Sequence, residues 1–214
     1  MHPIRVTVVV LALLLIPLAP AASAEDQLRP PSSRRDSKPL IRVHPDRYFP
    51  KLLSDTRQTW YSKHLVVMGE TSIQTLPKPK IQFVFRFLWL RTFHHPMAIC
   101  VTKYSDGKTT LSAKELSGQG GYEPGHLIKE VHVDWTKKEF EQLQSKLNKV
   151  KFFDQISVNQ SNTGADGAQW IFEVNDFGRY HFVDRSCPTG PDRDLGIFLL
   201  KAASVLPTNK SDIY

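Results

Sequence analysis

Apolar and polar residues alternate along the chain from Lys80 onward, and the apolar positions are mostly aromatic. A period of two belongs to a β-strand, because successive side chains of a strand point to opposite faces. The pattern therefore predicts a long strand with one aromatic face. Such residues favour burial, so we expect this face to lie in the core of a sheet and not to form a ligand platform. The alternating residues are Ile81, Phe83, Phe85, Phe87 and Trp89.

Shorter strands are expected on either side of two tight turns. Asp106-Gly107 and Asp176-Phe177-Gly178 each separate two runs rich in β-branched or aromatic residues, which is typical of a hairpin. Hairpins join antiparallel strands, so the sheet is expected to be mostly antiparallel. The further expected strands cover residues 97–104, 108–116, 126–133, 169–174 and 179–184.

Two amphipathic helices are expected near the C-terminal half of the chain. Thr136 and Glu139 have the spacing of a capping box, which predicts a helix over residues 137–150. A second helix is expected over residues 192–205. The residues expected to face the core are Phe140, Leu143, Leu147 and Val150 in the first helix, and Leu195, Phe198, Leu199 and Ala202 in the second.

An earlier helix is predicted within residues 48–64, because apolar residues recur there at helical spacing after Pro50. Residues 64–68 are expected to form a short strand. Runs of hairpin-connected strands followed by helices favour the α+β class. We therefore expect an α+β fold, with a mostly antiparallel sheet packed by two amphipathic helices.

The chain divides into four expected regions. Residues 1–24 resemble a secretory signal peptide, and residues 25–47 are a basic, proline-rich stretch that predicts a flexible leader. Residues 48–206 are long enough to form a single α+β domain. Residues 207–214 are expected to form a C-terminal tail.

The signal peptide prediction depends on three features. Arg5 supplies a positive start, residues 6–16 are almost wholly apolar, and Ala22-Ser23-Ala24 supplies the small residues of a cleavage site. No second apolar stretch is long enough to span a membrane, so no transmembrane segment is expected after cleavage. We therefore expect an exported protein, either periplasmic or secreted.

Charge changes this picture little. The chain has 28 basic and 21 acidic residues and a formal net charge of +7. Both signs are scattered along the chain, which is typical of a soluble surface, and nucleic acid is not expected as a partner. A polyanion-binding role for the basic leader, residues 25–47, stays open as an alternative.

The two cysteines, Cys100 and Cys187, both lie in the part of the chain expected to be exported. An even number of cysteines in an oxidising compartment favours a disulfide, and we expect these two to be paired. The alternative is that they are two separate small apolar residues of the core.

Four residues are candidates for a functional site: His94, His95, Tyr122 and His181. Adjacent histidines in a regular strand point to opposite faces, and the spacing of the other histidines matches no metal-binding motif, so no metal site is expected. The glycine-rich loop around Tyr122 lacks the helix that a phosphate-binding loop opens. No cofactor and no nucleophilic triad are expected, although His181 lies near Asp184 and Cys187 in sequence.

Three segments carry a resemblance to known proteins. RFLWLRTFHHP, KELSGQGGYEPG and DGAQWIFEVNDFGRYHFVDRSCP resemble segments of a group of uncharacterised exported bacterial domains. The resemblance covers roughly residues 80–205. It implies a bacterial envelope or secreted setting and adds no catalytic residue.

The sequence therefore predicts an exported soluble domain that acts as a non-enzymatic binding or interaction module of the cell envelope. Its partner is expected to be another envelope or extracellular protein, because strong core signals are accompanied by no convergent catalytic set. One alternative is an exported hydrolase-type enzyme that uses a histidine-containing site. The other is the polyanion-binding module.

Overall fold

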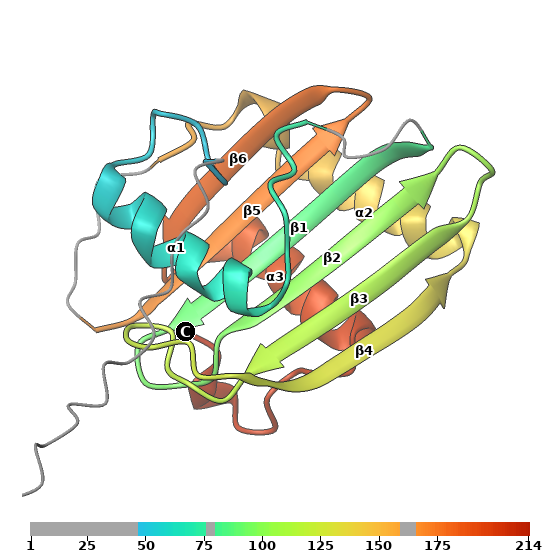
Figure 1. Cartoon of the computed structure of the whole chain (residues 1–214). Coiled ribbons are helices and arrows are strands. Elements are labelled where there is room, and N and C mark those ends of the chain that lie inside the picture. Colours follow the sequence, from blue (N-terminus) through green and yellow to red (C-terminus); the bar gives the residue numbers. More distant parts are fainter. Residues whose placement is uncertain (1–46, 76–79, 159–165) are drawn as a thin grey trace, which may run out of the picture. The chain divides into compact units, whose positions relative to one another are not determined.

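A computed structural model describes residues 47–75, 80–158 and 166–214. Within these residues the strands form one antiparallel sheet in the order β4-β3-β2-β1-β5-β6 (Figure 1). The expected α+β class and antiparallel sheet are confirmed. The strands are β1 Ile81–Arg91, β2 Met97–Tyr104, β3 Thr109–Leu116, β4 Leu127–Trp135, β5 Ala168–Asp176 and β6 Arg179–Ser186. The helices are α1 Asp55–Val67, α2 Lys137–Lys149 and α3 Gly190–Ala202, with short 3-10 helices η2 Phe152–Asp154 and η3 Lys210–Asp212.

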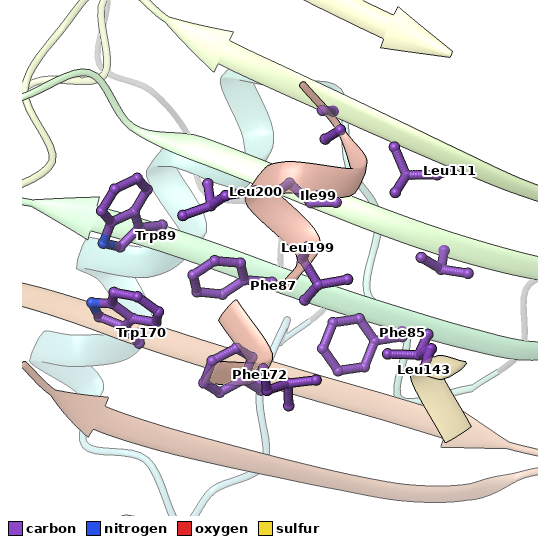
Figure 2. Close-up of a cluster of buried hydrophobic side chains, with 14 of the residues drawn as sticks. Phe85, Phe87, Trp89, Ile99, Leu111, Leu143, Trp170, Phe172, Leu199 and Leu200 are labelled. Atoms are coloured by element: carbon purple, nitrogen blue, oxygen red, sulfur yellow. The ribbon is translucent and has the colours of Figure 1, made fainter. Parts of the chain in front are cut away.

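The aromatic strand β1 lies inside the sheet, between β2 and β5. Its odd-numbered side chains form the core under α2 and α3, as the alternation predicts (Figure 2). Phe87 stacks on Phe172 of β5 with ring centroids 4.7 Å apart, and Trp89 meets Trp170 edge to face at 5.4 Å. The aromatic stripe is therefore core, and it is not a ligand platform.

Both predicted hairpins are present. The turn between β2 and β3 contains Gly107 at φ +90°, and the turn between β5 and β6 contains Gly178 at φ +89°. A positive φ costs glycine little because it has no Cβ, which explains why each turn carries a glycine at that point.

The helix α2 begins with the predicted capping box. The Thr136 side chain accepts a hydrogen bond from the Glu139 main-chain N–H, and the Glu139 carboxylate accepts one from the Thr136 main-chain N–H. Phe140, Leu143 and Leu147 are buried against the sheet. In α3, Leu195 and Leu199 are buried as expected, while Phe198 and Ala202 are partly buried at its margin.

The first helix differs from the prediction, because α1 continues to Val67 and residues 64–68 form no strand. Leu65 and Met68 instead pack on the face of the sheet opposite α2 and α3, together with apolar residues of β1, β5 and β6. Figure 1 shows α1 on that face. Packing there gives these residues apolar contacts over a helical period, which explains why the helix does not stop at His64.

The ends of the chain relate differently to this fold. The signal peptide prediction, residues 1–24, and the leader up to residue 46 lie outside the described residues. Residues 207–214, expected as a tail, contact the body of the protein. Ile213 is buried, and the indole N–H groups of Trp89 and Trp170 both donate to the main-chain oxygen of Tyr214, at 3.3 and 2.8 Å. Among the described helices, none is long and apolar enough to cross a membrane.

The packing of α2 can be tested with Leu143→Ala. Leu143 is fully buried between α2 and the sheet, so its truncation should lower the free energy of unfolding by about 2–5 kcal/mol. Gln142→Ala, at an exposed neighbouring position, is the control and should change it by less than about 0.5 kcal/mol. Urea unfolding measures the free energy of unfolding of both variants. Equally small decreases in the two variants would show that α2 buries another face.

Candidate binding cleft

A cleft of about 570 Å³ lies at the end of the sheet where β1 joins β2. Its walls come from that connection, from the adjoining ends of β3 and β4, and from the segment that follows α3. Segments far apart in sequence therefore meet around one hollow. The polar lining residues are Arg91, His94, His95, Glu115, Lys129, Ser204, Thr208, Asn209 and Asp212, and the apolar ones are Phe93, Met97, Val205, Leu206 and Pro207.

The two adjacent histidines both line this cleft but contact different partners. His94 Nδ1 lies 2.8 Å from the hydroxyl of Tyr214, and its Nε2 lies 3.8 Å from Asp212 Oδ1. His95 Nδ1 lies 3.0 Å from Glu115 Oε1. His95 is therefore positioned by Glu115, whereas His94 is positioned by the Tyr214 hydroxyl with Asp212 farther away, so the two rings have different partners.

Arg91 is the buried cation of the cleft. Its guanidinium lies over the Trp89 ring at 4.1 Å from the centroid and donates to the main-chain oxygens of Asp212 and His95. Its Nε has no hydrogen-bond partner within the described residues. Burial lowers the pKa of Arg91, and the nearby Tyr214, Asp212 and Glu115 oppose that effect.

The charges of the cleft are unevenly satisfied. Its two carboxylates, Glu115 and Asp212, already face imidazoles. No carboxylate of the described residues lies within 4.0 Å of a nitrogen of Arg91 or Lys129. Positive charge without a direct anionic partner therefore lines the cleft, exposed at Lys129 and buried at Arg91.

The other two candidates lie elsewhere. His181 on β6 packs against the ring of Phe152, and its Nε2 lies 3.0 Å from the main-chain oxygen of Gln155. Burial lowers its pKa, and the Gln155 carbonyl opposes this effect. Tyr122 is 53% exposed and contacts Phe93 at the rim of the cleft, with ring centroids 6.2 Å apart. Of the four candidates, only the two adjacent histidines lie in the cleft.

The predicted disulfide between Cys100 and Cys187 is wrong, and both cysteines are free. Cys100 lies in β2 and Cys187 follows β6, and the sheet order places β1 and β5 between these strands. Three strand spacings amount to about 14 Å, well beyond the reach of a disulfide. Cys187 instead accepts a hydrogen bond from the Ala168 main-chain N–H at 3.2 Å.

A buried polar network that the sequence analysis did not predict lies on the α1 face of the sheet. Its centre is the ion pair of Arg86 on β1 with Glu173 on β5, both fully buried, with Nε and Oε2 2.7 Å apart. The Tyr180 hydroxyl donates to Glu173, and Arg86 also donates to the main-chain oxygen of Thr71. Burial raises the pKa of Glu173, and the guanidinium of Arg86 opposes that effect.

Cys100 borders this network but is poorly suited to nucleophilic chemistry. Its Sγ lies 3.4 Å from Glu70 Oε2. Burial and the charge of Glu70 raise its pKa well above the ordinary value, against the opposing effect of Arg86. The reactive species of a cysteine is the thiolate, so a raised pKa at a buried site favours a structural role. Among the residues that the structure describes, no group of three His, Cys, Asp or Glu side chains could hold a metal ion.

The free cysteines predict a specific labelling pattern. Under denaturing, non-reducing conditions a thiol reagent should label both sites, because no disulfide protects them. In the native protein the partly exposed Cys187 should react faster than Cys100, which is buried and has a raised pKa. Mass spectrometry of labelled peptides measures both, with Cys187→Ser as the control. Labelling that appears only after reduction would contradict the strand order.

The ion pair predicts an asymmetry between single and double substitutions. Glu173→Ala leaves the buried guanidinium of Arg86 with only the more distant Glu70, 4.0 Å away, and should lower the free energy of unfolding by about 3–5 kcal/mol. Combining Arg86→Met with Glu173→Leu removes both charges of the pair. This double variant should lower the free energy of unfolding by less than Glu173→Ala alone. Chemical unfolding of the two variants measures this difference. A double variant that loses more unfolding free energy than the single one would show that the two charges are not coupled.

Comparison with known proteins gives no family for the chain. No model of a known protein family matches it, and no curated protein matches it. The function is therefore inferred from the geometry of the cleft.

Proposed function

We propose that this protein is a non-enzymatic binding protein whose cleft takes a carboxylate-bearing segment of another envelope or extracellular protein. The observation that carries the proposal is the uneven pairing of charge in the cleft. Arg91 and Lys129 have no carboxylate within 4.0 Å among the described residues, whereas Glu115 and Asp212 face His95 and His94. An incoming carboxylate would supply the missing anion.

The apolar part of the cleft extends this argument to the rest of the ligand. Met97 is buried, and it lines the cleft together with Val205, Leu206 and Phe93. Binding sites typically combine such apolar walls with a few polar groups that orient the ligand. A segment with an apolar side chain next to a carboxylate fits both parts of the lining.

The contacts of the histidines favour binding over catalysis. Both ring nitrogens of His94 face groups of the protein, namely the Tyr214 hydroxyl and Asp212. Within the described residues, no hydrogen bond joins either cleft histidine to a serine, a threonine or a cysteine. Activation of a nucleophile by a base depends on such a contact, although it is often loose before substrate binds.

The exported setting is part of the same proposal, and its support is the signal-like pattern of residues 1–24. Polyanion binding by the basic leader is a weaker proposal, because residues 25–46 lie outside the described part of the chain and no described contact bears on them.

A hydrolase is the second candidate, and one contact favours it. His95 Nδ1 lies 3.0 Å from Glu115, which leaves Nε2 without a partner among the described residues. A carboxylate on one ring nitrogen and a free second nitrogen is the arrangement that a general base uses. Such a base would activate water, because no side-chain nucleophile contacts it.

The carboxylate proposal can be tested by NMR with N-acetyl-leucine, using N-acetyl-leucinamide as the uncharged match. With methionine methyl groups labelled, the signal of Met97 in the cleft should shift with the acid and not with the amide. Met68 lies in the core under α1 and provides an internal reference. Lys129→Gln should weaken binding of the acid about tenfold, the value of one charged hydrogen bond.

The control variant is Lys138→Gln, which removes an exposed lysine of α2 that does not line the cleft and should leave binding unchanged. Equal shifts with acid and amide would refute recognition of the carboxylate. Turnover of N-acetyl-leucine methyl ester that disappears in His95→Ala but persists in Lys138→Gln would favour the hydrolase instead.

A further inference from the structure

The two edges of the sheet differ in how they are covered. At one edge, β6 is bordered by the segment that follows η2, since Val158 forms a parallel bridge with Asp184 and the Asp184 N–H donates to the Ser157 oxygen at 2.7 Å. At the other edge, β4 pairs with β3 alone among the described elements (Figure 1). An edge strand with a free outer side is a template for pairing with another strand.

The side chains of β4 are suited to pairing. Nearly the whole strand is exposed, yet it carries the large apolar residues Leu127, Ile128 and Val133, which are 39%, 47% and 37% exposed. Edge strands of monomeric proteins are commonly short, covered by another segment or marked by charged side chains. In the described part of the chain β4 is neither short nor covered, because it has nine residues and only β3 beside it, and its charged residues Lys129, Glu130 and Asp134 are its remaining protection.

We propose that a second copy of this chain pairs with β4, antiparallel and about a two-fold axis at Val131, so that the two sheets become one. An isologous contact of this kind joins the same strand of each copy. This inference depends on the edge strand alone and does not depend on the ligand proposed for the cleft.

Charge complementarity identifies the second copy as the occupant and sets the register. With Val131 opposite its own equivalent, Glu130 of each copy lies opposite His132 of the other. Within one chain, Glu130 Oε1 and His132 Nε2 already lie 3.1 Å apart on the same face of the strand. Opposite charges or hydrogen-bonding pairs directly across two strands stabilise the pairing.

The neighbouring symmetric registers are less favourable, and an axis at Glu130 would place that carboxylate opposite its own equivalent. A two-fold axis at His132 would place Glu130 opposite Asp134 of the other copy, and like charges directly opposite destabilise a strand pair. An axis at Val133 would carry the pairing into Thr136, whose main-chain N–H is already bonded to Glu139 in the capping box of α2. The register about Val131 avoids these conflicts.

Sedimentation velocity over a range of protein concentrations tests the proposal on the chain from residue 25. The wild-type protein should approach the mass of a dimer as its concentration rises. His132→Glu places two pairs of acidic side chains across the seam, which is the contact between the β4 strands of the two copies. Glu130→Arg places two arginines opposite His132. Each should weaken dimerisation about tenfold, because two cross-strand pairs are lost.

Restoration distinguishes self-pairing from any other explanation. The double variant, Glu130→Arg with His132→Glu, exchanges the positions of the acidic and the basic side chain and should dimerise again. An equimolar mixture of the two single variants should form heterodimers, because the introduced arginine then faces the introduced glutamate and Glu130 of the other chain faces His132. Matching far-ultraviolet circular dichroism and thermal unfolding of all variants exclude loss of the fold.

A wild-type protein that remains monomeric at every concentration would overturn the proposal. A dimer that neither single variant weakens, or that the double variant fails to restore, would also overturn it, because the seam would then lie elsewhere. If β4 instead binds an extended segment of a different protein, the purified wild-type chain, both single variants and the double variant all remain monomeric.

Discussion

The ion pair of Arg86 with Glu173 is the constraint around which the α1 face of the sheet is organised. Both side chains are fully buried, and an isolated buried charge costs several kcal/mol. The pair is satisfied because β5 lies directly beside β1 and because the described segment after α1, residues 68–75, crosses above it, where Thr71 accepts a hydrogen bond from Arg86. The same crossing holds Glu70 near Lys114, with Oε1 and Nζ 2.8 Å apart, so the network ties the end of α1 to β1, β3 and β5.

Local signals in the sequence were sufficient to predict most of the fold. The alternation of β1, the glycines of the two hairpins and the capping box of α2 each act over a few residues, so each could be read without tertiary information. The end of α1 could not be read in this way, because its buried side includes Gln58, Ser62 and His64. Burial, and to a lesser extent the charge of Lys63, lower the pKa of His64 to about 3, so it packs as a neutral ring.

The disulfide and the polar network show what local patterns cannot supply. Cys100 and Cys187 have an even count and a plausible compartment, but their separation depends on the order of the strands in the sheet. The sequence did contain one sign of the network, since Arg86 interrupts the most apolar strand of the chain. A charged residue inside such a strand needs a buried partner. The identity of that partner, Glu173, is set by the register of β1 with β5.

The cleft was predictable only in part for the same reason. His94 and His95 were candidates, whereas Arg91, Lys129 and Asp212 come from β1, β4 and η3 and meet only in the folded chain. Alternation along β4 also separates the two proposed surfaces. Lys129 pairs in register with Glu115 and lies on the α3 side, whereas Glu130 contacts Lys114 on the α1 side. The cleft thus uses Lys129 on the α3 side of β4, whereas the charge pairs proposed between two copies use Glu130 and His132 on the α1 side.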